Sequence, residues 1–541
     1  MTSTWRTVFA LILVMAFGSL RLAAQTPAVA PATQATQGGP AVQTPAPPQD
    51  PLIDRYTVGQ ARPPLAEGAQ LVELTLDQAY AIALEKNLDL KVARMTPIIQ
   101  DYNLQTMRAA YRPNFSGSYG YSNALTASNN VLDGVTSVTS VGQNYNTSLS
   151  QAFRYYGAPT VSAAWSNGRN TTNNVTARLN PTLSTGLNFS GNINLLNGFK
   201  IDSARNNWRS FPINKEIADI TLLNTIETTK SSVRNAYWQL RQAIEQIEIA
   251  RRSLELARKS WSDSLTKVEI GTAAQIDTVT FESSVTNNEQ VLLAAEISWQ
   301  TAELNFKRLL VTGTDDELYR KTINPVDKPE LSVQQVDIQA AVTRTLGEAT
   351  NLIIQRKQLQ LSRLTYEVTQ QSLLPSLQAN GSYRVNGQGG TQHINGETIP
   401  GGWTDALGLL GDYPTWSFGF SVTYRLGQLQ ERANVAIGQI QIDQAVARLK
   451  AQELTTSTAV INAGLNVQNS YKQYQSAVKN REAQVRNAEA AQIRFDNGLL
   501  TNFEVVQAQN SLTTSRLSEL RALISYVNAI ADFERVQKIG G

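Results

Sequence analysis

The sequence predicts a fold of α-helices and transmembrane β-strands, in which a β-barrel shared between chains continues into a long antiparallel α-helical coiled-coil tunnel. Along the 541 residues, a succession of helix, strand pair and long helical hairpin occurs twice. The long helices also keep a heptad pattern over a length that no compact domain needs. The internal duplication and these long hairpins together favour a pore that is part barrel and part helical tube.

Residues 1–24 have the pattern of a signal peptide. Arg6 supplies a positive charge, residues 8–17 are apolar, and residues 22–24 end in small side chains before Gln25. The apolar run is too short for a membrane-spanning helix, which needs about 20 residues. Residues 25–66 are rich in Pro, Ala, Gln and Thr, a composition that predicts a disordered segment.

The first predicted repeat spans residues 67–330. Thr75 is the expected N-cap of its first helix, and Pro113 ends the following helical stretch. Residues 114–195 then alternate apolar with polar side chains, as strands between lipid and water do. A soluble β-sandwich shows the same alternation. A long helical hairpin is predicted over residues 200–310.

The second predicted repeat spans residues 331–541. Its first helical stretch ends before Pro375, strands are predicted within residues 377–426, and a second long hairpin is predicted over residues 428–536. Each repeat contains two clear strands, about four for the chain. The number rises to six if a hairpin over residues 141–168 joins the same sheet rather than lying outside it.

The long helices carry apolar side chains on a 4-3 heptad seam, which indicates a left-handed coiled-coil surface. In the first repeat the seam holds Val233, Tyr237, Leu240, Ile244, Ile247, Leu254, Trp261, Leu265 and Val268, with Arg251 and Arg258 in two positions. In the second repeat it holds Val467, Tyr471, Tyr474, Val478, Val485, Ala488 and Phe495, with Arg481 and Gln492 in two positions.

Both long helices end three residues before a glycine that begins a turn. Tyr237 and Tyr471 are 234 residues apart, whereas Gly271 and Gly498 are 227 apart, a difference of seven. An insertion of one whole heptad leaves the seam facing the same way, whereas most other lengths would rotate it away from its partner. We therefore interpret the two halves as an internal duplication.

The composition excludes several classes of function. With 47 basic and 44 acidic residues the net charge is +3, too even for a nucleic-acid-binding protein. The chain has no cysteine, which excludes thiolate metal sites and cysteine nucleophiles, and its one histidine, His393, lies in a Gly-rich stretch. We find no catalytic constellation and expect no enzyme activity, no metal and no cofactor.

Strands exposed to lipid need a partner for every backbone amide, because an unsatisfied amide in hydrocarbon costs several kcal/mol. Four strands cannot close a barrel, so their open edges must pair with further copies of the chain. Three copies would supply enough strands to enclose water, and the helices would continue below the membrane as a tube.

Over residues 72–536 the chain resembles the TolC-like outer-membrane efflux proteins. The motifs that carry the resemblance, together with the two glycine turns, are Leu74-Thr-Leu-Asp-Gln-Ala, Asn87-Leu-Asp-Leu, Tyr111-Arg-Pro, Leu374-Pro-Ser-Leu, Leu195-Leu-Asn-Gly-Phe199 and Val233-Arg-Asn-Ala-Tyr-Trp. The resemblance implies a homotrimeric channel-tunnel in outer-membrane lipid of a Gram-negative cell, with its helical domain in the periplasm.

The resemblance also implies partners and site residues. The hairpin tips, here Gly271, Thr272, Gly498, Leu499 and Leu500, would dock on a periplasmic adaptor of an inner-membrane RND, ABC or MFS pump. The channel would then export small molecules, or polypeptides by type I secretion.

The family's closed periplasmic gate has a ring of acidic side chains, and the resemblance assigns Glu504 to that ring and Asp277 to a latch. The usual second carboxylate is Gln507 here, and the usual arginine partner of the latch is Leu500. Three like charges near an axis would favour cations. Both carboxylates also suit a helix N-terminus, so the cap and the gate stay open as interpretations.

Two other functions were compared with the channel. A periplasmic or surface coiled-coil scaffold explains the signal peptide and the heptads, but it does not explain why strands and helices recur in the same order. A secreted enzyme would need catalytic residues that the sequence does not contain.

Overall fold

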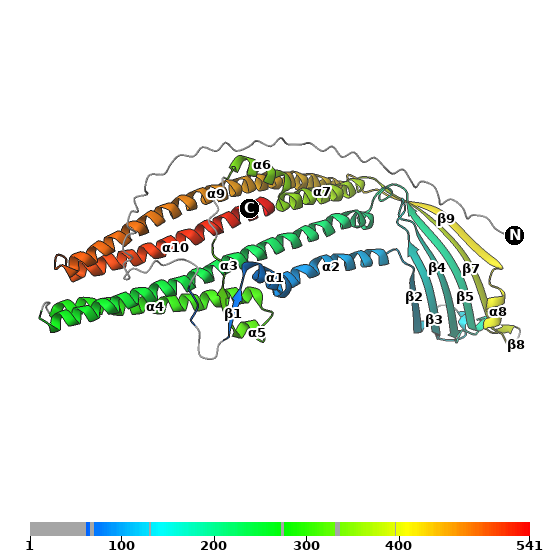
Figure 1. Ribbon diagram of the computed structural model, residues 1–541. Helices are drawn as coiled ribbons and strands as arrows, with labels where there is room; N and C mark the ends of the chain where they lie inside the picture. The colour runs from blue at the N-terminus through cyan, green and yellow to red at the C-terminus, as the bar shows by residue number, and fades with distance from the viewer. Residues whose placement is uncertain are drawn as a thin grey trace, which may run out of the picture. The chain divides into compact units, whose positions relative to one another are not determined.

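The computed structural model describes residues 61–64, 70–128, 131–271, 275–329, 336–394 and 397–540. The expected signal peptide (1–24) lies outside these ranges. The expected disordered segment (25–66) lies outside them as well, except for residues 61–64. Within them, long helices form two antiparallel hairpins and the long strands form one sheet (Figure 1). None of the described helices combines the length and apolarity that a membrane-spanning helix requires.

In the first half of the chain, two short helices precede the strands and two long helices follow them. These are α1 (Leu76–Lys86), α2 (Leu88–Ala109), α3 (Ser203–Glu269) and α4 (Gln275–Leu310), with a single turn α5 (Glu317–Arg320) after them. Thr75 caps α1 through a capping box with Gln78, and Asn87 caps α2. At roughly 1.5 Å per residue α3 is about 100 Å long. It contains Pro212, so the helix begins before this proline.

The second half repeats this order. It contains α6 (Ile338–Glu348), α7 (Thr350–Gln371), a short α8 (Trp403–Gly408) between two strands, α9 (Leu429–Asp496) and α10 (Asn502–Ile539). In each half the second short helix packs beside the long one, α2 on α3 and α7 on α9 (Figure 1). The duplication expected from the sequence is therefore confirmed by the fold.

The strands form a seven-stranded antiparallel sheet. Its members are β2 (Asn114–Ala127), β3 (Ser137–Ala152), β4 (Thr160–Thr172), β5 (Leu179–Asn194), β7 (Ser376–Ile394), the short β8 (Glu397–Ile399) and β9 (Tyr413–Thr423). Six of these strands are long and lie in the order β2-β3-β4-β5-β7-β9. The two strands from the second half thus continue the sheet begun by the first.

The expectation of about four strands per chain is corrected to six long ones. The hairpin over residues 141–168, which the sequence left either in the sheet or outside it, is the β3–β4 pair. It lies within the sheet because β3 pairs with β2 along one side and β4 pairs with β5 along the other, without a break in register. Sequence alternation alone does not show which strands are neighbours.

Arg205 holds the junction between the strands and α3. Its guanidinium bonds Asp202, the N-cap of α3, at 3.0 Å, and donates to the carbonyl oxygens of Tyr155, Phe199 and Gly198. The side chain is largely buried and ties the β3–β4 turn to the start of the helix. It fixes the direction in which the helix leaves the sheet.

The heptad seams lie within the two hairpins. From Val233 to Leu254 the apolar members of the first seam are buried, whereas most members of the second are partly buried and Leu265 is exposed. Each seam also contains an arginine that pairs across its hairpin with a glutamate of the returning helix. Arg258 of α3 is 2.7 Å from Glu289 of α4, and Arg481 of α9 is 2.9 Å from Glu519 of α10. Both ion pairs join the long helix to the returning helix of the same hairpin, which explains why these arginines stand in the seams.

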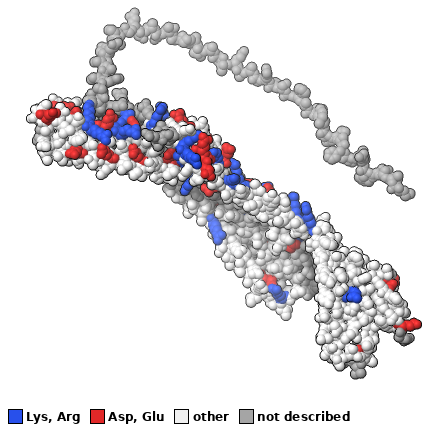
Figure 2. All heavy atoms as spheres, turned by 90° about the horizontal axis from the view of Figure 1, so that it is seen from below, with Lys and Arg blue, Asp and Glu red and all other residues white. Residues whose placement is uncertain are grey.

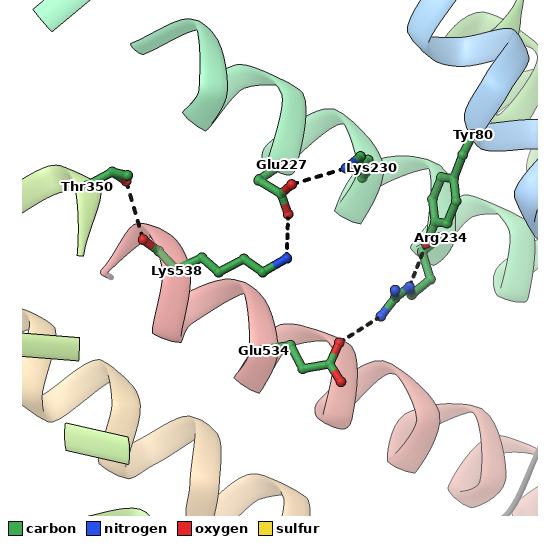
Figure 3. A network of polar contacts seen from close by, with 7 residues as sticks. All are labelled: Tyr80, Glu227, Lys230, Arg234, Thr350, Glu534 and Lys538. Carbon is green, nitrogen blue, oxygen red and sulfur yellow. Dashed lines mark hydrogen bonds and ion pairs between the residues drawn. The ribbon is translucent and has the colours of Figure 1, made fainter. Parts of the chain in front are cut away.

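Polar contacts join α3 of the first repeat to α10 of the second, as Figure 3 shows. Lys538 lies 3.2 Å from Glu227, and Arg234 lies 3.8 Å from Glu534. The Nε of Arg234 also donates to the hydroxyl of Tyr80 in α1 at 2.7 Å. These contacts connect the middle of α3 to the last turns of α10, away from the hairpin tips.

A two-stranded parallel sheet, β1 (Leu71–Leu74) with β6 (Thr322–Pro325), packs beside α3 at the same level. The buried hydroxyl of Tyr237 lies 3.1 Å from the carbonyl oxygen of Leu74 and 3.0 Å from the Asp327 carboxylate, and it accepts the Asp327 N–H at 3.0 Å. Burial raises the pKa of the Tyr237 phenol. The hydroxyl connects the strands to the long helix.

We expect Tyr237→Phe to lower the stability of the assembled protein by about 1–3 kcal/mol, because one buried and two partly buried polar groups lose a partner. Thermal unfolding of the detergent-extracted protein would measure this. Tyr471→Phe is the matched control, since Tyr471 is the corresponding residue of α9 and packs its ring on Tyr526 instead. Equal losses of stability in both variants would contradict the role of the Tyr237 hydroxyl in connecting the strands to α3.

Candidate functional site

The tips of both hairpins are glycine turns. Gly271 has φ 78° and Gly498 has φ 72°, in the left-handed region that favours glycine. Gly271 N–H donates to the carbonyl of Val268, and Gly498 N–H donates to that of Phe495, each at 2.9 Å. The two turns therefore close their helices with the same bond, as their alignment in the sequence predicts.

Glu504 stands on the first turn of α10 and is exposed. Its carboxylate accepts the Thr501 N–H at 3.0 Å and the Thr501 hydroxyl at 2.8 Å, completing a capping box. These hydrogen bonds lower the pKa of Glu504. The charge is therefore present at neutral pH at the tip of the second hairpin, and the side chain also serves as a helix cap.

The other expected tip residues have different places. Thr272 and the side chain of Asp277 lie outside the described residues. Leu499 is 76% exposed, whereas Leu500 packs against a small buried cluster of Ala488, Ala491, Ala508 and Leu512. Leu500 thus supports the hairpin from within, and Leu499 extends into solvent.

Further apolar side chains at the tips are exposed, and the sequence analysis missed them. They include Ile270 at 68%, Ile276 at 73% and Phe503 at 67%. Their position next to the two glycines was visible in the sequence. Ile276 and Phe503 stand in the first turns of α4 and α10, where heptad spacing does not show whether a side chain is covered. Isolated exposed apolar side chains are ordinary, whereas a group of them at a hairpin tip indicates a contact surface.

Near the tips the two hairpins contact each other through a lysine and a pair of aromatic rings. Lys267 of α3 is 3.8 Å from the Asp496 carboxylate and lies 4.0 Å from the centroid of the Phe495 ring, both on α9. Phe281 of α4 meets the same ring edge-on, with centroids 6.1 Å apart. The contacts connect the end of one hairpin to the other.

The sheet has one apolar face and one polar face. Residues that share a face can be followed across all long strands through the register, for example Tyr119, Tyr145, Asn167, Thr185 and Gly387. The same face presents large side chains to the outside of the chain: Phe115, Tyr121, Leu149, Trp165, Phe189, Tyr383, Trp416, Phe418, Phe420 and Val422.

The opposite face carries Ser, Asn, Gly and Thr almost throughout. One row across the sheet reads Ser148, Ala164, Asn188, Arg384 and Thr415. Charged side chains gather over the helices and are few on the sheet (Figure 2). In the long strands only Arg169 and Arg384 are charged, all residues of these strands being described. Such a sheet suits a wall between hydrocarbon and water.

The connection between β7 and β9 folds back onto the apolar face through α8. A Cβ atom at Gly387 would lie 1.8 Å from the carbonyl oxygen of Ala406, and one at Gly389 would lie 2.6 Å from the Ala406 nitrogen. Ala406 is fully buried. Glycine in β7 is therefore what lets α8 approach the strand, a use of the Gly-rich stretch that the sequence analysis did not foresee.

These features define a class of protein, in which a sheet with one apolar and one polar face is continued by coiled-coil hairpins in two repeats. Comparison with known proteins identifies the family. The family model described as outer membrane efflux protein matches residues 151–311 and 341–536. The chain belongs to this family of outer-membrane transport proteins. A search of curated protein sequences finds no match.

Solved structures of outer-membrane channels have the same fold. The Campylobacter jejuni CmeC channel superposes with a TM-score of 0.62 at 16% identity, covering 86% of each chain. Vibrio cholerae VceC gives 0.61 at 13% identity, covering 86% of this chain and 96% of its own. The open state of Neisseria gonorrhoeae MtrE gives 0.58 at 16% identity, covering 86% and 89%. The expected TolC-like fold is confirmed.

Proposed function

We propose that this chain is the outer-membrane channel of a tripartite efflux pump or type I secretion system. It would act as a passive conduit from the periplasm to the exterior, for small molecules or polypeptides. The observation that carries the proposal is the division of one six-strand surface into an apolar and a polar face. No step in this function needs catalysis or a cofactor.

The open edges of the sheet support a homotrimer. β2 pairs only with β3, and β9 pairs only with β7, so each has one side without a partner strand in the described chain. In a bilayer such edges must be paired, and a copy of the same chain offers the complementary edge. Three chains of six long strands would give eighteen, enough for an aqueous lumen.

The helical hairpins would extend into the periplasm, away from the sheet. Exposed apolar side chains beside Gly271 and Gly498 suit docking on a periplasmic adaptor, which would connect the channel to an inner-membrane RND, ABC or MFS pump. Leu499 would belong to this contact and Leu500 would support it from inside the hairpin. A contact of Thr272 with the adaptor is predicted from the sequence alone.

Glu504 would form a ring of three carboxylates at the periplasmic end of the trimer, with Asp277 as a latch residue. In planar bilayers we expect Glu504→Ala, alone or with Asp277→Ala, to raise conductance about twofold or more, or to weaken block by divalent cations. Glu504→Gln separates charge from cap, because glutamine keeps the capping box without the charge.

If the charge forms the gate, Glu504→Gln and Glu504→Ala change conductance or block alike, while Gln507→Ala leaves both unchanged. If Glu504 is only a cap, Glu504→Gln matches the wild type. Complete absence of channels from the wild-type protein would contradict the conduit itself and favour the alternative, an exported coiled-coil scaffold without a pore.

A further inference from the structure

Arg169 is the one charged side chain on the apolar face of the long strands, all of whose residues are described. It pairs in register with Gln143 of β3 and Leu183 of β5, which places it on the same face as Trp165. The other strand arginine, Arg384, lies on the polar face, where its Nε donates to Asn386 at 2.7 Å. A charge on a lipid-facing surface is costly, so its position requires an explanation.

Helix α8 builds a pocket beside this arginine. Because α8 packs closely on Gly387 and Gly389, its residues Trp403 and Leu407 lie beside β3 and β4. The pocket has a volume of about 390 Å³ and is lined by Gln143, Tyr145, Trp165, Asn167, Arg169, Trp403 and Leu407. Aromatic and aliphatic walls with one cation suit an amphiphile rather than a small ion.

The position of the pocket along the strands fits the outer margin of a membrane. Arg169 is nine residues along β4 from Thr160, which lies at the helix end of the sheet. At roughly 3.3 Å per residue this is about 30 Å of strand, and a strand tilt of about 40° reduces it to about 23 Å of depth. The apolar band of such barrels is about 25 Å tall.

No carboxylate neutralises Arg169. Among the described residues its guanidinium has neither an ion pair nor a hydrogen bond, and none of the pocket's lining side chains is acidic. Asp405 of α8, the nearest acidic residue in sequence to Trp403, turns away to accept the Gly402 N–H at 2.8 Å. The pocket therefore combines an unpaired guanidinium with apolar walls.

We propose that this pocket binds a phosphorylated lipid of the outer leaflet of the outer membrane. Arg169 would hold the phosphoryl oxygens in a bidentate, charge-assisted contact. Tyr145, Trp165, Trp403 and Leu407 would pack along the acyl chains. The inference rests on the proposed function, since it takes the apolar face as the lipid face.

The test uses the full mature chain, delipidated in maltoside micelles and mixed with radiolabelled lipid A. Gel filtration then reports bound lipid and oligomeric state in the same run. We expect the wild-type trimer to retain the lipid, Arg169→Gln to bind it roughly fivefold or more weakly, and Arg384→Gln, the matched control on the polar face, to bind it as the wild type does. Trp403→Ala, outside the strands, should also weaken binding.

Equal binding by wild type, Arg169→Gln and Trp403→Ala would overturn the proposal, as would equal binding of the same lipid without its phosphates. Displacement of the lipid by millimolar inorganic phosphate would assign the site to free phosphate instead. If Arg169→Gln does not assemble into a trimer, lipid binding by Arg169→Lys and Trp403→Ala is compared with that of the wild type instead. A wild type that elutes as a monomer refutes the proposed channel, whereas a wild-type trimer without lipid refutes only the lipid site.

Discussion

Replacing Phe418 by arginine is expected to prevent stable insertion of the protein in the outer membrane. Phe418 is 64% exposed in the isolated chain and lies near the middle of β9 on the apolar face. An arginine on the lipid face of a barrel wall costs up to about 2–4 kcal/mol per chain, depending on its depth, besides the lost contact of the phenyl ring with lipid. Since an assembly of three chains carries the change three times, the effect should be large.

Gly419→Arg is the matched control, one residue further along the same strand. A Cβ atom at Gly419 meets no atom within 4 Å, and its side chain would lie on the polar face with Asn380. The amount of heat-modifiable oligomer in purified outer membranes measures both variants. We expect almost none for Phe418→Arg and near wild-type amounts for Gly419→Arg. Equal amounts, or loss only in Gly419→Arg, would mean that the two faces are assigned incorrectly.

Replacing Gly387 by valine is expected to displace α8 from the sheet. The added Cβ would lie 1.8 Å from a backbone oxygen of Ala406, so the helix or the strand must move. Overpacking of this kind typically costs about 1–3 kcal/mol, and here the obstacle is backbone rather than a flexible side chain. Release of α8 would expose the segment near Trp403 to protease in intact cells.

Gly381→Val provides the comparison, because Gly381 lies on the same strand and the same face but has no neighbour within 4 Å of a Cβ position. A valine there faces lipid in our account and should leave cleavage near Trp403 unchanged. Similar cleavage rates for both variants would show that the glycine is not what seats α8.

The repeat and the hairpins could be predicted because their determinants are local. Heptad spacing, Thr75 as a cap and glycine after each long helix all act within a few turns, and the structure has them where the sequence places them. The number of strands in the sheet could not be fixed in this way. Whether β3 and β4 join β2 and β5 is decided by pairing between segments far apart, which alternation does not encode.

The candidate site was predictable in part. The glycines and Glu504 stand out in an alignment of the two halves, but the capping contact of Glu504 with Thr501 needs coordinates. Lys267 reads as an ordinary solvated charge until Asp496 and Phe495 are placed beside it. The pocket at Arg169 could not be predicted either. It depends on the face that Arg169 shares with Trp165, and on a helix more than 200 residues later that covers the same face.

A shared barrel requires that the chains pair through their open edges, β2 and β9. Native mass spectrometry of the protein extracted in mild detergent from a purified outer-membrane fraction tests it most directly. We expect one dominant species with the mass of three mature chains, which is lost when the Phe418→Arg change is introduced. A monomer in that fraction, or a protein recovered only in the soluble periplasm, would contradict the shared barrel and favour the scaffold.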